Sequence, residues 1–307
     1  MYLYLPVALT SINVLIPVGL GLAVGLLSGL FGVGGGFLMT PLLIMLGIPS
    51  TVAAATDSNQ IVAASTSGTY AHWKIGNVDF KMGFYLLAGG FAGGLAGVQG
   101  IKVLKAMGNA DFVIKITYVL MLGIVGSYMF FESLQSMKKK KAEAVEVKPG
   151  KESWMTKFLK SLPLQTHFEK SGVTHSVLVP VIFGGFVGIL AAVMGVGGGF
   201  LMVPVMVYIL RMPMHVVVGT SLFQILFNCI EVTFLQAYTN HSVDFILAVL
   251  LLIGSTLGAQ VGTVFGRKLK ADQLKVILAG IVLLVTVKMV FDLTLSPSLL
   301  LGLGGGH

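Results

Sequence analysis

The eight-residue phrase Gly-Val-Gly-Gly-Gly-Phe-Leu-Met occurs twice in this chain, at residues 32–39 and 195–202. Each copy is followed two residues later by a proline, Pro41 or Pro204. Three consecutive glycines cost a helix roughly 1 kcal/mol each relative to alanine. Backbone that leaves the helix inside a bilayer must be buried in protein or line a watery cavity. Two such interruptions, at matching places in two halves, are typical of the binding site of a transporter.

The composition around the phrase is that of an integral membrane protein. Of the 307 residues, 55% are hydrophobic and only 10% are charged, whereas soluble domains carry about a quarter charged residues. The net charge of +8 is concentrated between two apolar halves without interleaved aromatic residues. This favours a cytoplasmic loop that obeys the positive-inside rule over a nucleic-acid-binding surface. Cys229 is the only cysteine, and the histidines lack ligand spacing, so neither a metal nor another cofactor is expected.

Each half contains five apolar elements in the same order. In the first half they are expected at residues 12–31, 36–47, 50–72, 82–104 and 112–133, and in the second at residues 176–194, 199–210, 214–237, 244–266 and 273–294. Polar, acidic and glycine positions match between the halves, for example Thr56 with Thr220, Gln60 with Gln224, Gly89 and Gly93 with Gly254 and Gly258. The halves are therefore an internal duplication, with a first repeat at 1–133, a basic linker at 134–172 and a second repeat at 173–307.

The second element of each repeat has about 12 residues, or about 18 Å of helix. A hydrocarbon core is about 30 Å thick, so this element alone is too short to span it. The fold class we predict is all-α membrane protein, in which each repeat has a Gly-broken helical hairpin and about three further transmembrane helices. Whether the hairpins span the bilayer or are re-entrant is left open.

The distribution of positive charge predicts the orientation of the repeats. Nine lysines lie in the 134–172 linker, which places the linker in the cytoplasm. An odd number of crossings in each repeat then puts both termini outside and gives the two repeats inverted topology. Lys102, Lys105 and Lys115 go against the rule.

The third element of each repeat carries a polar stripe at helical spacing. The stripe consists of Thr56, Asn59, Gln60, Ala63 and Ser67 in the first repeat, and of Thr220, Gln224, Asn228 and Glu231 in the second. Polar groups without partners are costly in hydrocarbon, so a lipid-facing helix lacks such stripes. The stripes favour contact with a substrate. The alternative is that they only join neighbouring helices by hydrogen bonds.

The glycine runs precede the short second elements and leave backbone N–H groups free at their first turns. Such helix starts attract anions, because the donors lack partners and the helix dipole is positive there. The Gly89/Gly93 and Gly254/Gly258 pairs, by contrast, are expected to serve close helix packing. The predicted substrate-binding residues are Gly34, Gly35, Gly36, Thr56, Asn59, Gln60, Gly197, Gly198, Gly199, Thr220, Gln224 and Asn228.

Asp57 and Glu231 are the only acids well inside the third elements. In the inverted arrangement both lie outward of the Gln60/Gln224 level, where burial disfavours the charged form of a carboxyl. They are therefore candidate proton carriers that would neutralise an anion as it crosses. The alternative is that Glu231 joins a buried hydrogen-bond network, or pairs with Lys288, and never changes charge.

The doubled Gly32–Pro41 and Gly195–Pro204 phrases, the polar third elements with Gln60 and Gln224, and the basic central loop resemble the TauE/SafE sulfite exporter family, also called the toluene sulfonate uptake permeases. The resemblance implies a secondary transporter of small sulfur-containing anions, such as sulfite, sulfoacetate or other sulfonates, in a prokaryotic cytoplasmic membrane. Its partners would be that anion, the lipid bilayer and, through the two acids, protons.

Other functions stay open at this point. A passive anion channel would use the same residues, and a thiol carrier or membrane-embedded enzyme would need Cys229 as its nucleophile. The counterpart of Cys229 in the other repeat is Ser65, and a lone cysteine in an apolar helix usually serves packing. The anion, the direction of transport, the coupling ion and the oligomeric state, including a homo-oligomer, are not determined by the sequence.

Overall fold

The computed structural model describes residues 2–31, 36–139, 163–266 and 271–295. The first half of the chain contains β1 (Tyr2–Leu5), β2 (Thr10–Asn13), α1 (Leu15–Phe31), α2 (Gly36–Met45), α3 (Ser50–Ile75), α4 (Phe80–Ala106) and α5 (Ala110–Lys139). The second consists of β3 (Gln165–Phe168), β4 (Val173–Ser176), α7 (Leu178–Met194), α8 (Gly199–Pro204), α9 (Met214–Leu235), α10 (Phe245–Gly266) and α11 (Ala271–Leu295). Helix α8 continues into the π-helical turn η1 (Val205–Ile209), and α9 continues into η2 (Gln236–Asn240). The expected all-α membrane architecture is confirmed, and helix ends lie within a few residues of the predicted ones.

Four of the described helices are long and apolar enough to cross a membrane. They are Phe80–Ala106, Ala110–Tyr128, Met214–Asn240 and Phe245–Gly262. Shorter apolar helices occur at Leu15–Leu27, Gly36–Met45 and Leu178–Met194. Helix α3 is long enough at 26 residues, but it carries the polar stripe of the first repeat.

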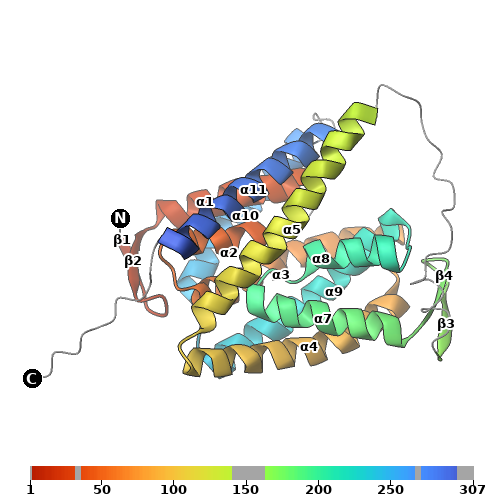
Figure 1. The fold of residues 1–307 in the computed structure, drawn as a ribbon, viewed down its shortest axis with the longest axis horizontal. Coiled ribbons are helices and arrows are strands. Elements are labelled where there is room, and N and C mark those ends of the chain that lie inside the picture. Colours follow the sequence, from red (N-terminus) through yellow and green to blue (C-terminus); the bar gives the residue numbers. More distant parts are fainter. Residues whose placement is uncertain (1, 32–35, 140–162, 267–270, 296–307) are drawn as a thin grey trace, which may run out of the picture.

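Two β-hairpins, which the sequence did not predict, lie at opposite ends of the helical bundle (Figure 1). In the first, β1 pairs antiparallel with β2, and in the second β3 pairs antiparallel with β4. The second hairpin spans 165–176, so the repeat boundary drawn at residue 173 falls inside it. Strands of four residues are too short for alternation of polar and apolar residues to be recognised.

The first helix of each repeat packs against the fourth helix of the other, α1 against α10 and α7 against α4. Glycines make both contacts close. A Cβ atom at Gly254 or Gly258 would collide with the backbone of α1, and one at Gly89 or Gly93 would collide with the backbone of α7. The packing role predicted for these four glycines is confirmed.

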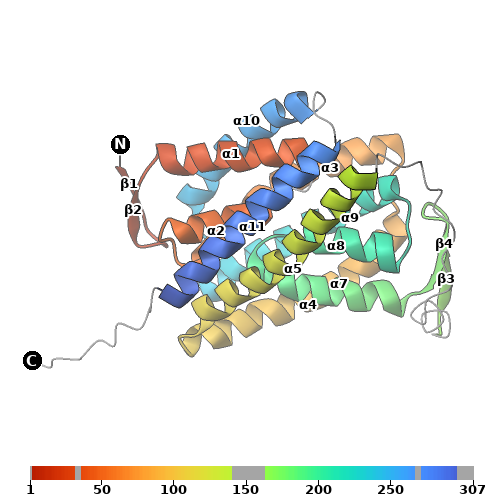
Figure 2. The ribbon, with the colours of Figure 1, turned by 45° about the horizontal axis from the view of Figure 1, so that its top comes forward.

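Equivalent helices also cross each other, α3 with α9 and α5 with α11 (Figures 1 and 2). Gly219, near the start of α9, lies against Asn77, just past the end of α3. On α5, Gly123 faces Thr286 and Gly126 faces Val282 of α11. A later position on one helix therefore meets an earlier position on its partner, and both pairs run antiparallel.

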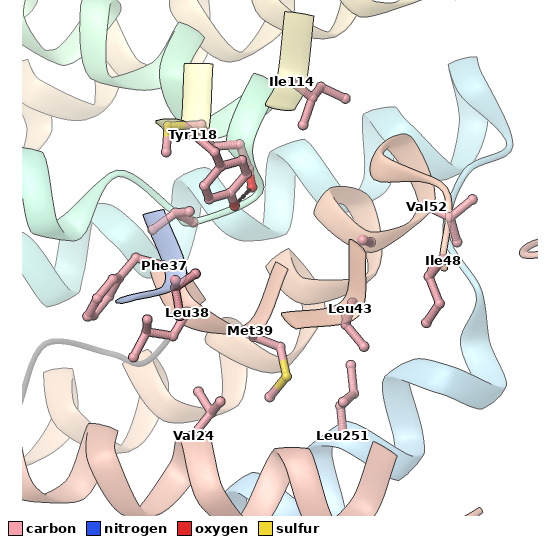
Figure 3. Packing of buried hydrophobic residues seen from close by; sticks show 14 of the residues in the cluster. Val24, Phe37, Leu38, Met39, Leu43, Ile48, Val52, Ile114, Tyr118 and Leu251 are labelled. Carbon is pink, nitrogen blue, oxygen red and sulfur yellow. Dashed lines mark hydrogen bonds between the residues drawn. The ribbon is translucent and has the colours of Figure 1, made fainter. Parts of the chain in front are cut away.

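The short helix α2 is enclosed by the largest hydrophobic cluster (Figure 3). Its buried side chains contact residues from α1, α3, α5 and α10, and the cluster includes Val24, Phe37, Leu38, Met39, Leu43, Val52, Ile114, Tyr118 and Leu251. A helix that is apolar on all sides is stable when surrounded in this way. The enclosure therefore explains how a helix of 10 residues is held without spanning a bilayer.

Candidate functional site

The crossing of α3 and α9 is the point where the two glycine phrases meet the two polar helices. Ile61 of α3 packs there with Ile225 and Cys229 of α9. A Cβ atom at Gly36, the first residue of α2, would collide with Ile61, and one at Gly199, the first residue of α8, would collide with Ile225. Both short helices therefore begin at the crossing.

The second glycine phrase includes the segment between two helices, and the broken hairpin expected there stays a prediction. Helix α7 ends at Met194 and α8 begins at Gly199. Between them, Gly195, Gly197 and Gly198 have φ angles of +71°, +69° and +75°, which side chains with a Cβ rarely adopt. In the first phrase, Gly34 and Gly35 lie outside the described residues.

Packing also restricts the size of the residues in the second glycine phrase. A Cβ atom at Gly197 would collide with Cys229 and Ile225, and one at Gly198 would collide with Val187. Unlike Gly36 and Gly199, these two glycines combine such a collision with a positive φ angle, so both packing and backbone conformation favour glycine there without any ligand.

Three buried amides flank the crossing. Gln60 is 5% exposed, Gln224 is 0% exposed and Asn228 is 1% exposed. Both amide atoms of Gln224, both of Asn228 and the Oε1 of Gln60 have no hydrogen-bond partner among the described residues. Buried amides are normally paired, because leaving them without partners is costly. These amide groups are therefore among those that the described part of the fold leaves without a hydrogen-bond partner.

Helix α4 makes room for the polar face of α9 by presenting glycines to it. A Cβ atom at Gly90 would collide with the amide of Asn228, and one at Gly94 would come within 2.8 Å of Oε2 of Glu231. The two glycines are four residues apart, so they lie on the same face of α4. The amide of Asn228 and the carboxyl of Glu231 therefore pack directly on the α4 backbone.

The two predicted threonines have partners in the opposite repeat. The backbone N–H of Asp244 donates to Oγ1 of Thr56 at 3.1 Å, and that of Asp79 donates to Oγ1 of Thr220 at 3.0 Å. Both hydroxyl groups are buried, so each threonine holds the start of a helix from the other repeat. The substrate-binding role proposed for them stays a prediction, as does that of Asn59, which is only half-buried.

The same two aspartates cap helices and bind the hairpin turns. Asp79 accepts from the N–H of Met82 at 3.0 Å, and Asp244 accepts from the N–H of Leu247 at 3.1 Å, at the first turns of α4 and α10. The second oxygen of Asp79 accepts from the N–H and hydroxyl groups of Ser171, between β3 and β4.

The second oxygen of Asp244 has the equivalent partners in the first hairpin. It accepts from the N–H groups of Val7 and Ala8, between β1 and β2, at 3.1 and 3.4 Å. We call these two sites the Asp79 junction (Asp79, Thr220, Ser171) and the Asp244 junction (Asp244, Thr56, Val7, Ala8). Each junction joins both repeats, and the matching Val-Asp-Phe triplets were its only signal in the sequence.

The two candidate proton carriers have different surroundings. Asp57 is fully buried, and the hydroxyl of Thr40 donates to its Oδ2 at 2.8 Å. Its Oδ1 has no hydrogen-bond partner among the described residues, and neither has Oε2 of Glu231. Glu231 is half-buried, and Lys288, considered as its ion-pair partner, is exposed on α11. Within the described part of the chain, no three His, Cys, Asp or Glu side chains gather as a metal site would require.

A further polar network that the sequence did not reveal fastens the end of α9. We call it the η2 network (Lys105, Gln236, Asn240, Ser242). Gln236 donates to the carbonyl of Ala192 at 3.1 Å, and Asn240 donates to Oε1 of Gln236 at 2.6 Å. Lys105 of α4 donates to the carbonyl of Asn240 at 2.9 Å and to the hydroxyl of Ser242 at 3.2 Å. Lys105, one of the three lysines that go against the positive-inside rule, therefore has structural partners.

Comparison with known proteins identifies the family. The family model described as "Sulfite exporter TauE/SafE" matches residues 18–289, a span that contains both glycine phrases, both polar helices and both acids. The chain belongs to the TauE/SafE family. This TauE/SafE protein is therefore a multi-pass membrane transporter, and the sequence-based choice of a transporter over an enzyme is confirmed.

Its relatives include bacterial and plant proteins. The "Probable membrane transporter protein YjnA" of Bacillus subtilis (strain 168) is 28% identical over 272 residues, which cover 88% of this chain and 97% of that protein. YunE of the same organism is 26% identical over 285 residues, covering 89% and 96%. The "Sulfite exporter TauE/SafE family protein 2" of Arabidopsis thaliana is 32% identical over 108 residues, covering 34% and 24%. No solved structure matches the chain significantly.

Proposed function

We propose that this TauE/SafE protein is a secondary transporter of small sulfur-containing anions, such as sulfite, sulfoacetate or other organosulfonates, and that it works by alternating access around the α3/α9 crossing. The observation that carries the proposal is the set of buried amide atoms at that crossing that have no hydrogen-bond partner among the described residues, namely both of Gln224, both of Asn228 and Oε1 of Gln60. Sulfite and sulfonate oxygens accept hydrogen bonds from amide N–H groups, and an ionised acceptor strengthens such bonds. The name of the family supports this chemical class.

Inverted repeats are part of the proposal. A two-fold axis in the membrane plane makes each helix that crosses its own equivalent run antiparallel to it, which is the arrangement of α3 with α9 and of α5 with α11. The same axis pairs α1 with α10 in the way that it pairs α7 with α4. The two hairpins at opposite ends of the bundle (Figure 1) are consistent with it.

The β3–β4 end of the bundle is assigned to the cytoplasm. Lys81 donates to the carbonyl of His167 in β3 at 3.0 Å, and Lys170 donates to the carbonyl of Gly76 at 3.3 Å. Lys74 lies in the last turn of α3, at the same end. This concentration of lysines supports the orientation given by the positive-inside rule, with the chain termini outside.

Alternating access is supported by a difference between the two polar helices. On α9 and its continuation η2, Asn228, Gln236 and Asn240 are buried, whereas their equivalents on α3 include the exposed Ala64 and the half-buried His72. One helix face is therefore covered towards the β1–β2 end, and its equivalent is uncovered towards the β3–β4 end. In the proposed transport cycle, the covered face becomes uncovered and the uncovered face becomes covered. The anion site then opens to each side of the membrane in turn.

The test of the substrate class is a thermal-shift screen of the purified protein against sulfite, sulfate, thiosulfate, sulfoacetate, taurine and acetate. A ligand that binds the folded state raises its melting temperature by mass action. We expect sulfite or a sulfonate to do so and acetate not to. Counterflow of the bound anion in proteoliposomes then separates a carrier from a channel, because only a carrier shows saturation and exchange. A response to carboxylates alone would contradict the substrate class.

The test of the orientation is cysteine labelling in intact cells, with Cys229→Ser as background. Single cysteines at Thr10, Gly150 and Gly302 are expected to label from outside, inside and outside, respectively. Residues 150 and 302 lie outside the described residues, so the labelling adds information that the structure lacks. Labelling of position 150 by an impermeant reagent would exclude the inverted topology.

A further inference from the structure

The equivalent glutamines Gln60 and Gln224 differ in the residue that precedes them by three positions, about one helical turn. This residue is Asp57 on α3 and Ser221 on α9. The hydroxyl of Ser221 donates to the carbonyl of Val218 on its own helix at 3.1 Å, and both amide atoms of Gln224 have no partner among the described residues. Gln60, by contrast, follows the carboxyl of Asp57 by about one helical turn, and its Oε1 is buried without a hydrogen-bond partner among the described residues.

The carboxyl of Asp57 lies in an environment without a cation. Thr40, a neutral side chain, donates to Oδ2, while Oδ1 has no hydrogen-bond partner among the described residues. Two titratable side chains lie close enough to be affected by a charge on Asp57, namely Tyr118 of α5 and Cys229 of α9. Neither is positively charged at neutral pH, and the hydroxyl of Tyr118 donates to the carbonyl of Met194.

The elements packed around α3 supply no compensating positive charge to Asp57 within the described residues. Helices α2, α7 and the described part of α10 contain no ionisable side chain. On α9, His215 is exposed near the helix start and Glu231 is half-buried. On α5, Lys115 is half-buried and Asp111 is exposed, and no ion pair joins Asp57 to either helix. A buried carboxylate without a cation is costly, so the neutral, protonated acid is the form that this site tolerates best.

We propose that Asp57 is the proton-binding residue of this transporter, and that its protonation decides whether Gln60 offers its amide N–H groups to the anion. When Asp57 is ionised, it is only an acceptor and holds the N–H side of the Gln60 amide. When it takes up a proton from solvent, its O–H donates to Oε1 of Gln60, and the amide turns so that its N–H groups face the crossing. Protonated carboxyls are donors and amides carry both functions, so the exchange loses no hydrogen bond.

This inference rests on the proposed transport function and adds that the anion binds together with a proton. Proton binding and anion binding each favour the other, and by linkage the coupling is the same in both directions. Gln224, which has Ser221 in place of an acid, is available at every pH. The site therefore takes up one proton with one anion, which reduces the charge that crosses the bilayer.

Glu231 does not have the same relation to its neighbouring amide. It follows Asn228 by three residues, but both amide atoms of Asn228 have no hydrogen-bond partner among the described residues. The amide of Asn228 instead packs against Gly90 of α4, where a Cβ atom would collide with it. Glu231→Gln is therefore the matched control for substitutions of Asp57.

The first experiment needs no anion. Infrared spectra of the purified protein in lipid nanodiscs are recorded as the pH is raised. The wild type is expected to show a protonated-carboxyl C=O band that disappears with rising pH, that is absent from Asp57→Asn and Asp57→Ser, and that persists in Glu231→Gln. Asp57→Ser copies the residue of the second repeat, which protects the test against a failure of one variant to fold. The absence of an Asp57-dependent band at every pH would overturn the proposal.

The second experiment measures protons taken up on anion binding, by calorimetry in buffers of different ionisation enthalpy. Sulfoacetate is the probe, because sulfite itself titrates near neutral pH. With the acid ionised beforehand, the wild type is expected to take up about one proton per anion bound, and Asp57→Asn none. Gln60→Leu should abolish this uptake and Gln224→Leu should preserve it, although both weaken binding. A merely structural role of Asp57 would not separate the two glutamines.

The outcomes separate this inference from the proposed function. If neither sulfoacetate nor sulfite binds, the proposed function fails, while the infrared band still decides whether Asp57 titrates. If sulfoacetate binds without proton uptake, or if Na⁺ replaces protons in promoting binding, transport stands and the role of Asp57 is refuted. Equal loss of proton uptake in Gln60→Leu and Gln224→Leu would refute the control of Gln60 by Asp57.

Discussion

The two junctions and the two polar helices, all duplicated, have diverged to different extents. At the Asp79 and Asp244 junctions the same aspartate caps a helix, meets a threonine of the other repeat and binds the turn of the other hairpin. Along the polar helices, the position equivalent to Asp57 is occupied by Ser221, and the position equivalent to Glu231 is occupied by Ser67. The contacts that join the repeats are symmetric, whereas each of these two acids has a serine at the equivalent position of the other polar helix. Joining the repeats accounts for the symmetry of the junctions, and the proposed coupling to protons accounts for its loss at Asp57.

Removal of a junction aspartate is expected to have the largest effect. Asp79→Ala and Asp244→Ala should each lower the free energy of unfolding by about 3 kcal/mol or more, because each leaves several buried N–H groups without an acceptor. If the junctions are equivalent, the two losses should be similar in thermal or denaturant unfolding. Asp111→Ala, at the exposed first turn of α5, is the control and should cost less than about 1 kcal/mol. A loss of stability at only one junction would show that the two junctions are not equivalent.

Removal of an amide at the crossing comes next. Gln60→Ala and Gln224→Ala should each raise the Kd for the anion about tenfold at low pH, where both amides are available, because each loses about one hydrogen bond. As the pH rises, the wild type should lose the contribution of Gln60, so the Gln60→Ala variant should differ from it less and less. Binding titrations at two pH values measure this. A pH-independent difference for Gln60→Ala would contradict it.

Restoring the symmetry of the polar helices should change the stoichiometry. Ser221→Asp places an acid one turn before Gln224 and copies the first repeat. It is expected to raise proton uptake from about one to about two protons per anion, measured in the same calorimetric assay, with a modest change in affinity. Uptake that stays at one proton would show that the surroundings of Asp57, such as Thr40, are also needed.

Disruption of the η2 network should have the smallest effect. Asn240→Ala removes bonds to Gln236 and to the carbonyl of Val98, worth about 1 kcal/mol each. In a Cys229→Ser background, a cysteine at Thr239 should then label a few-fold faster. Its equivalent position, Ile75, is already 72% exposed and should not respond. Faster labelling at both positions would indicate general loosening of the bundle.

The helices and the polar stripes were predictable because their signals are local and periodic. Glycine runs, apolar segments of known length and matching polar positions all lie within short windows of sequence. The hairpins and junctions were not, since Asp244 and Val7 are 237 positions apart and four-residue strands carry little signal. Thr56 shows why the residues of the site could not all be predicted. A hydroxyl that accepts a hydrogen bond from a backbone N–H of the other repeat has the same sequence pattern as a hydroxyl that faces a ligand.

The cross-repeat capping has a consequence for biosynthesis. When α4 has been made, the acceptor oxygens of Asp79 have no turn to bind until Ser171 follows, and Asp244 binds a turn that was synthesised at the very beginning of the chain. We therefore expect the first repeat to stay incompletely folded until the second repeat has been made. Two half-length chains cut within the linker would each be substrates for membrane quality control when expressed alone, and they would escape degradation when produced together.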